Sequence, residues 1–162
     1  MNRRFLFLSL SLLLMGLIFM GCKQEPKTFL FTYSMESVDN YKIVVSFDSE
    51  KKYKVEEYNY FLDNQANKKD PKIKEGELTA EEYADIKDKI FKADLFKMDE
   101  TYGFDGDDSR SDLGDIMYQV YLSVDGEEKY ISIANNKDLK FPAPFVNLVN
   151  VVSGFLNTHK AK

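Results

Sequence analysis

Apolar and polar residues alternate in three short runs near the start of the chain, at residues 29–35, 41–47 and 53–62. A period of two is typical of a β-strand that buries one face, so the sequence predicts three strands here. The third run carries aromatic residues at both odd and even positions, and therefore on both faces of the predicted strand. One of these faces is expected to stay partly exposed. The polar stretch 63–76 is expected to form a long loop with at most a short strand at its end.

A capping pattern predicts where the first helix begins. Thr79 is suited to cap the first turn, and Glu82 three residues later completes a capping box. Apolar residues then recur at helical spacing, at Tyr83, Ile86 and Ile90. The sequence therefore predicts an amphipathic helix that lies against a sheet and ends near residues 92–94. Residues 95–98 are expected to pack in the core as the chain leaves this helix.

A second alternating run, at residues 118–124, leads into Asp125-Gly126, and apolar residues return beyond it at Ile131 and Ile133. Asp-Gly is well suited to a two-residue type I′ turn, so the sequence predicts a β-hairpin. Counting across the turn pairs Val120 with Ile131 on the core face. The same count pairs Tyr121 with Tyr130 on the opposite face.

The last apolar pattern follows Pro142 and Pro144, which suit the start of a helix. Its members recur at helical spacing, at Phe145, Leu148, Val149, Val152, Phe155 and Leu156. The order of elements contains two hairpins and no alternation of single strands and helices. We therefore expect residues 28–158 to form one α+β domain, an antiparallel sheet of about five strands with two helices packed on one face.

Composition narrows the chemistry that this domain can carry. The chain has 162 residues with one Cys and one His, so one copy cannot assemble a zinc site from three or four such ligands. His159 falls in residues 159–162, where we expect a frayed tail. The sequence offers no His-based catalytic triad, and we expect a protein that is not an enzyme and that needs no cofactor.

The N-terminus has the layout of an export signal. Arg3 and Arg4 precede an apolar run from residue 5 to residue 20, which is short for a membrane-spanning helix and contains Ser and Gly. Gly21 followed by Cys22 resembles the lipobox of bacterial lipoproteins, although Phe19 and Met20 depart from its commonest residues. The resemblance implies that residues 1–21 are a signal peptide and that Cys22 carries the acyl chains.

The remaining features at this end fit a lipid anchor. Residues 22–27 would be the acylated Cys22 and a short polar tether. Lys23 directly after Cys22 resembles outer-membrane lipoproteins, so the expected location is the bacterial cell envelope, at the outer membrane. Loss of residues 1–21 removes Arg3 and Arg4 but no acid, so the net charge falls from −5 to −7. Because the basic residues are also interleaved with acids, nucleic acid is not expected as a partner.

An acidic segment, residues 103–115, contains five Asp, three Gly and two Ser. Asp105, Asp107 and Ser109 offer oxygen ligands at the first three spacings of an EF-hand loop, which makes Ca²⁺ binding one hypothesis. Arg110 stands where that loop needs Gly, and Ile116 stands where it needs the bidentate Glu. A solvated acidic loop whose residues serve turn geometry is the interpretation that we favour.

Four segments between residues 76 and 156 resemble the emfourin-type inhibitors of thermolysin-like metalloproteases. They are LTAEEYADIKDKI at 78–90, KADLFKM at 92–98, MYQVYLSVDG at 117–126 and PAPFVNLV at 142–149. The resemblance implies a small α+β domain that inhibits a protease. Our first hypothesis from the sequence is broader: a membrane-anchored lipoprotein that binds another protein. The protease inhibitor and the Ca²⁺-binding module are the alternatives.

Overall fold

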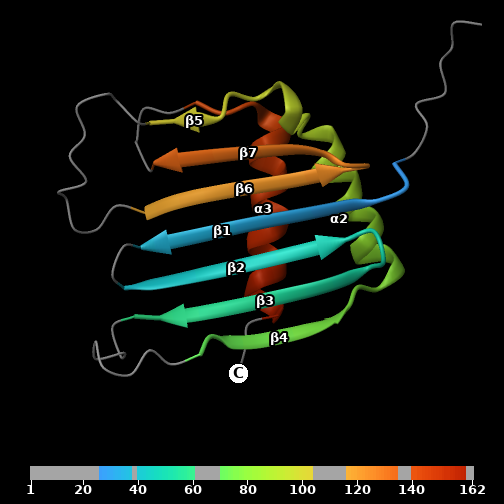
Figure 1. The fold of residues 1–162 in the computed structure, drawn as a ribbon. Helices are drawn as coiled ribbons and strands as arrows, with labels where there is room; N and C mark the ends of the chain where they lie inside the picture. The colour runs from blue at the N-terminus through green and yellow to red at the C-terminus, as the bar shows by residue number, and fades with distance from the viewer. Residues whose placement is uncertain (1–25, 38–39, 61–69, 104–115, 135–139, 160–162) are drawn as a thin grey trace, which may run out of the picture.

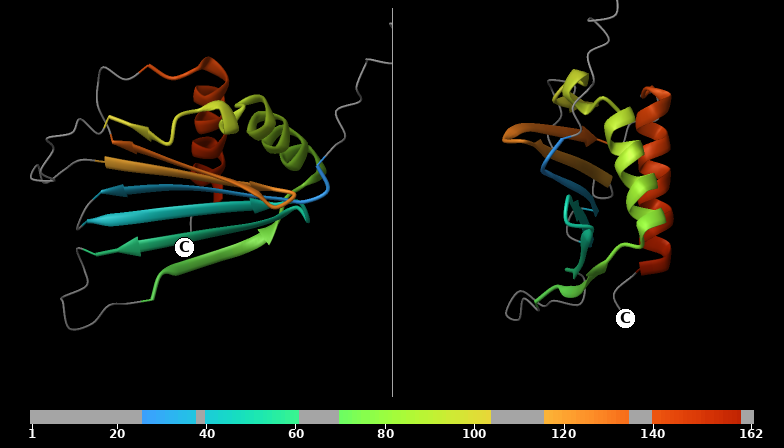
Figure 2. Two further views of the ribbon diagram at one scale, coloured as in Figure 1. Left: turned by 45° about the horizontal axis from the view of Figure 1, so that its top comes forward. Right: turned by 90° about the vertical axis from the view of Figure 1, so that its right-hand side faces the viewer.

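The computed structural model describes residues 26–37, 40–60, 70–103, 116–134 and 140–159. In chain order the elements are β1 (Phe29–Ser37), β2 (Tyr41–Asp48), β3 (Lys52–Asn59), β4 (Lys72–Glu77), α2 (Ala80–Lys92), the 3-10 helix η1 (Leu95–Lys97), β5 (Thr101–Tyr102), β6 (Ile116–Val124), β7 (Glu127–Ala134) and α3 (Ala143–His159). The strands form one seven-stranded sheet in the order β4-β3-β2-β1-β6-β7-β5, with α2 and α3 on one face (Figures 1 and 2). The prediction of an α+β fold with two helices on one face is confirmed.

The prediction of about five antiparallel strands was wrong in the number of strands. One addition is β4, which pairs with β3 at an edge of the sheet. Its sequence KIKEGE has almost no apolar alternation, and its one large apolar residue, Ile73, is exposed. The strand forms through backbone pairing, and its charged side chains are typical of an edge that avoids further pairing.

The second addition is β5, whose two residues pair with β7. This pairing is parallel, so the sheet is mixed, whereas every other neighbouring pair is antiparallel. Two residues carry no readable periodicity, which explains why the sequence did not reveal the strand. The predicted packing of residues 95–98 is confirmed for Leu95 and Met98, which are buried where the chain turns toward β5.

The predicted hairpin is confirmed in its turn and its register. Asp125 and Gly126 both have positive φ, 49° and 93°, as a type I′ turn requires. Val120 lies opposite Ile131 with both side chains buried, and Tyr121 lies opposite Tyr130 on the other face. This hairpin joins the N-terminal strands through antiparallel pairing of β1 with β6.

Both helices bury the apolar faces that the sequence predicts. Helix α2 begins with the capping box at Thr79 and Glu82 and buries Ile86 and Ile90. Helix α3 buries the predicted residues Phe145, Leu148, Val152, Phe155 and Leu156, and Val149 packs partly against the same core. Within the described ranges, no helix is long and apolar enough to cross a membrane.

Candidate functional site

The helical layer covers the helix-bearing face of the sheet unevenly. Helix α3 crosses the strands near their middle, and α2 lies beside it over the half where β1 begins (Figure 1). None of the helices in the described part of the chain lies over the other half, where β1 ends (Figures 1 and 2). At that end the sheet face beside α3 is therefore not covered by a described helix.

Strand register brings side chains from six strands into one row on this half. Each member of the row is paired directly with the next: Ile133, Tyr118, Met35, Ile43, Glu57 and Lys72. They share the parity of the buried core residues on their strands, such as Val120 and Val45. Because alternate residues of a strand face the same side, the row belongs to the face that carries the helices.

Two hollows adjoin this row and α3, and the larger also reaches Lys42 and Tyr58, whose side chains have the opposite parity. The larger has a volume of about 570 Å³ and lies over β1, β2 and β3, and the smaller, of about 250 Å³, lies over β6 and β7. Tyr33, Met35 and Ser153 line both hollows. Because they share these walls, we treat them as one feature, the α3 groove, which crosses the strands alongside α3.

The chemistry of the α3 groove changes along its length. At the β7 end its wall is apolar and aromatic, with Tyr118, Ile133, Phe141, Phe145 and Val149. At the β3 end it carries polar and charged residues, namely Glu57, Asn59, Asp70 and Lys72. An apolar surface that ends in a few polar groups is common in binding sites, where the polar groups fix the orientation of the ligand.

Two tyrosines meet at the centre of the groove. Tyr33 is 4% exposed, and its ring centroid lies 6.1 Å from that of Tyr118. Burial raises the pKa of Tyr33 far above its ordinary value, with smaller contributions from Tyr118 and Tyr41. Burial, followed by the charge of Tyr41, also raises the pKa of Tyr118. Both phenols are therefore neutral at physiological pH, and they offer hydroxyl hydrogen bonds rather than charge.

Helix α3 presents an uncharged stripe to the groove. Val146, Val149, Ser153 and Asn157 line the groove at spacings of three and four residues, which places them on one side of the helix. None of the 17 residues of α3 is Asp, Glu, Lys or Arg. Helix α2 differs, because its surface carries ion pairs such as Asp88–Lys92 at 2.9 Å. Depletion of charge combined with aromatic and Met side chains is typical of the centre of a protein interface.

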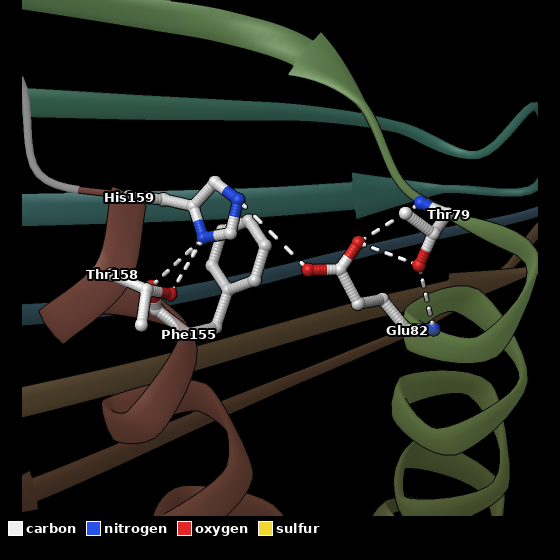
Figure 3. A network of polar contacts seen from close by, with 5 residues as sticks. All are labelled: Thr79, Glu82, Phe155, Thr158 and His159. Atoms are coloured by element: carbon white, nitrogen blue, oxygen red, sulfur yellow. Dashed lines mark hydrogen bonds and ion pairs between the residues drawn. The ribbon is translucent and has the colours of Figure 1, made fainter.

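A second cluster joins the start of α2 to the end of α3 (Figure 3). The Glu82 carboxylate accepts hydrogen bonds from the Thr79 backbone N–H at 2.9 Å and from its hydroxyl at 2.8 Å. These bonds lower the pKa of Glu82, and His159 contributes a smaller charge effect. Nε2 of His159 lies 3.9 Å from Oε1 of Glu82. The geometry accounts for helix capping and for contact between the two helices.

The assignment of His159 to a frayed tail was wrong. The residue ends α3, and its ring stacks on Phe155 with centroids 4.0 Å apart. Tyr53 contacts the same ring edge-on at 5.2 Å, and the His159 side chain is only 23% exposed. The i, i+4 relation with Phe155 holds His159 on the helix, because both rings lie on the same helical face.

The face of the sheet without helices is mostly polar. Tyr121 and Tyr130 pair there with ring centroids 4.6 Å apart, and the Tyr121 hydroxyl donates to Glu128 at 2.9 Å. Tyr130 is 60% exposed. An isolated aromatic pair on a polar face is ordinary cross-strand packing, so this face is a weaker candidate than the α3 groove.

The site residues predicted from the sequence lie outside the described residues. Cys22 precedes them, and Asp105, Asp107 and Ser109 fall in the gap 104–115. Lipidation and Ca²⁺ binding therefore stay predictions. Among the described residues alone, no group of three or more His, Cys, Asp or Glu is arranged to hold a metal ion.

Sequence reasoning missed the α3 groove because its residues are far apart in the chain. Tyr33 and Tyr118 were each identified as strand residues, and only the β1–β6 register places them together. The one local signal was the absence of charge from residues 143–159. No protein-family model matches the chain, and neither does any curated protein. The resemblance to emfourin-type inhibitors stays a prediction.

Proposed function

We propose that this chain is a lipid-anchored protein of the bacterial envelope, and that its α+β domain binds an amphipathic helix of a protein partner in the α3 groove. The observation that carries this proposal is the largely apolar α3 groove beside a helix without charged side chains. The resemblance of Gly21-Cys22 to a lipobox supports the anchor.

The dimensions of the groove favour a helix as the occupant. Along the strands the groove extends from Tyr33 to the level of Tyr41, which pairs with Ser37 at the end of β1, and four residues span roughly 13 Å. Across the strands it runs from β3 to β7, four strand spacings of about 4.8 Å, or roughly 19 Å. A helix is about 10 Å wide, and three turns are about 16 Å long. One helix of the partner therefore fits beside α3, opposite α2.

The lining defines what that helix must present. Its sheet-facing side needs aromatic or aliphatic residues at helical spacing, because Tyr118, Met35 and Ile43 lie beneath it. Over the β3 end it needs polar or charged residues that match Asp70 and Lys72. This is the helix-in-groove mode, in which anchors at positions i, i+3 or i+4, and i+7 supply most of the affinity.

Site-specific photo-crosslinking in cells tests the proposal. A photoreactive residue is placed in the full chain at Val146 and, in a second variant, at Tyr118. The matched controls are Tyr130 on the opposite face of the sheet and Glu81 on α2, which are both exposed. We expect one crosslinked protein from the groove positions and none of it from the controls. Peptide mapping is expected to place the crosslinks on the apolar side of one helix in that protein.

Three results would contradict the proposal. One is a failure of both groove positions to crosslink while the protein is folded and present in the envelope. Another is crosslinking to partner residues that do not lie on one face of a helix. The third is a product that contains only a second copy of this chain, which would make the groove a dimer interface.

A further inference from the structure

The β6–β7 turn forms hydrogen bonds with the chain just before β1 begins. Oδ1 of Asp125 accepts hydrogen bonds from the backbone N–H groups of Lys27 at 3.1 Å and Thr28 at 2.9 Å. It also accepts one from the Thr28 hydroxyl at 3.2 Å. The backbone N–H of Asp125 donates in return to the Thr28 carbonyl at 3.1 Å. We call these four bonds the Asp125 clasp.

The turn itself does not require these bonds. A type I′ turn accepts Asn, Gly or Asp at the first central position, where Asp125 has φ of 49°. In the clasp the carboxylate instead binds Thr28 and Lys27, which precede Asp125 by 97 and 98 positions in the chain. The Thr28 backbone N–H, followed by that of Lys27, lowers the pKa of Asp125, so the negative charge strengthens the contact.

The clasp defines where the folded domain starts. Directly after it, Phe29 pairs with Val124 of β6, and its carbonyl accepts from the backbone N–H of Ser49 at 3.0 Å. The chain is therefore held by the β6–β7 turn from Lys27 onward and on both sides from Phe29 onward. Only the four residues 23–26 separate Cys22 from Lys27, and five peptide steps reach at most about 17 Å.

We propose that the Asp125 clasp and this short tether hold the domain in one orientation on the bilayer, with the β6–β7 turn facing the lipid and the α3 groove opening away from it. The inference rests on the proposed lipid anchor at Cys22. Strand β1 runs from Phe29 to Ser37, and eight steps of about 3.3 Å place its groove end roughly 26 Å beyond the clasp end. The groove is thus presented to partners that approach from the aqueous side.

Without the clasp, the free tether would lengthen. Release of Lys27 and Thr28 adds two flexible residues and removes the fixed exit direction of the chain. The domain would then tilt more freely about its anchor, and the difference between the two ends of the sheet in mean distance from the bilayer would shrink. If the clasp sets the orientation, replacing Asp125 changes the orientation. If the tether alone sets it, replacing Asp125 does not.

Energy transfer to the membrane tests the orientation. The full mature lipoprotein is reconstituted into vesicles of phosphatidylethanolamine and phosphatidylglycerol that contain an acceptor lipid. Glu50→Cys carries a donor dye at the clasp end, and Asp70→Cys carries it at the groove end, since both positions are exposed. The chain has only one other Cys, Cys22, so each engineered thiol is unique once Cys22 is acylated. We expect several-fold stronger transfer from position 50 than from position 70.

Three variants separate the clasp from folding effects. Asp125→Gly keeps the positive φ of the turn but removes the carboxylate, and it should bring the two transfer signals closer together. Asp125→Asn keeps an acceptor oxygen and should preserve the difference. Insertion of a six-residue Gly-Ser stretch between Lys23 and Lys27 should reduce the difference further without changing the domain. Thermal melting checks that each variant is folded.

The outcomes for the clasp and for the anchor can be told apart. Equal transfer from both positions in a protein that floats with the vesicles overturns the proposed orientation and leaves the anchor intact. A difference in Asp125→Gly that is as large as in the unmodified chain overturns the role of the clasp. A protein that does not float and whose intact mass shows a free thiol at Cys22 overturns the proposed function, and the orientation with it.

Discussion

Tyr53 and Gly76 lie directly opposite each other across β3 and β4, and a Cβ atom on Gly76 would lie 2.6 Å from the Tyr53 hydroxyl oxygen. The Tyr53 ring cannot easily move aside. It packs edge-on against Phe155 at 5.1 Å and against His159 at 5.2 Å between centroids. The missing side chain at position 76 thus lets the edge strand approach the ring that contacts the end of α3.

Gly76→Ala is expected to destabilise the domain by about 1–3 kcal/mol, because the added methyl group must displace a packed ring. Gly154→Ala is the matched control, since nothing lies within 4 Å of the Cβ that it adds in α3. That variant should stabilise the domain by roughly 0.5–1 kcal/mol, because Ala favours a helix more than Gly does. Urea denaturation measures both, and equal effects from the two substitutions would contradict the packing described for Tyr53.

The capping box of α2 should contribute measurably to stability. Thr79→Ala removes the hydroxyl that accepts from the Glu82 backbone N–H at 3.2 Å. The expected loss is about 1 kcal/mol in the free energy of unfolding. Thr79→Ser keeps the hydroxyl and should change stability by only a few tenths of that amount. A loss in Thr79→Ser as large as in Thr79→Ala would assign the effect to the Thr methyl group instead.

The same cap predicts a dependence of stability on pH. The hydrogen bonds from Thr79 lower the pKa of Glu82 in the folded state, so the unfolded chain binds a proton more readily. The contribution is fully present above the unfolded pKa of Glu, about 4.3, and is lost as pH falls below it through the folded pKa. Melting curves of the wild type and Glu82→Gln between pH 3 and 7 test this. The stability difference between them should shrink in acid, and a difference that grows in acid would contradict the assignment.

Two apolar residues of α3 should separate binding from folding. Val146 lines the α3 groove and is 42% exposed, so Val146→Asp should change stability by less than about 0.5 kcal/mol and abolish crosslinking from Tyr118. Leu148 is buried on the opposite, core-facing side, and Leu148→Ala should cost about 2–5 kcal/mol. If Val146→Asp leaves crosslinking unchanged, the groove is not the binding surface.

The elements with long apolar periodicity were predictable from the sequence. The face of β1 that carries Phe31 and the face of α3 that carries Leu148 are each determined by residues close in sequence, so their burial follows from local spacing. The type I′ turn was predictable for the same reason, because Asp125 and Gly126 specify its backbone. Edge strand β4 was largely hidden, since its pairing with β3 uses backbone groups that any sequence has.

The candidate site was hidden for a different reason. Met35 and Tyr118 are neighbours only because β1 pairs with β6, which follows it by some eighty residues, and no local pattern specifies that pairing. His159 likewise gains its surroundings from Tyr53 on a distant strand. The groove and the ring cluster at the end of α3 therefore both depend on which distant residues are paired. The periodicity of one sequence does not predict that pairing.

The most direct test of the central claim is the intact mass of the protein isolated from the membranes of an expressing Gram-negative host. The account predicts a chain that begins at Cys22, with residues 1–21 removed and a mass increase equal to a diacylglyceryl group plus an amide-linked acyl chain. Cys22→Ser should prevent this processing. A mature chain with an unmodified thiol at Cys22, or one cleaved beyond it, would contradict the account.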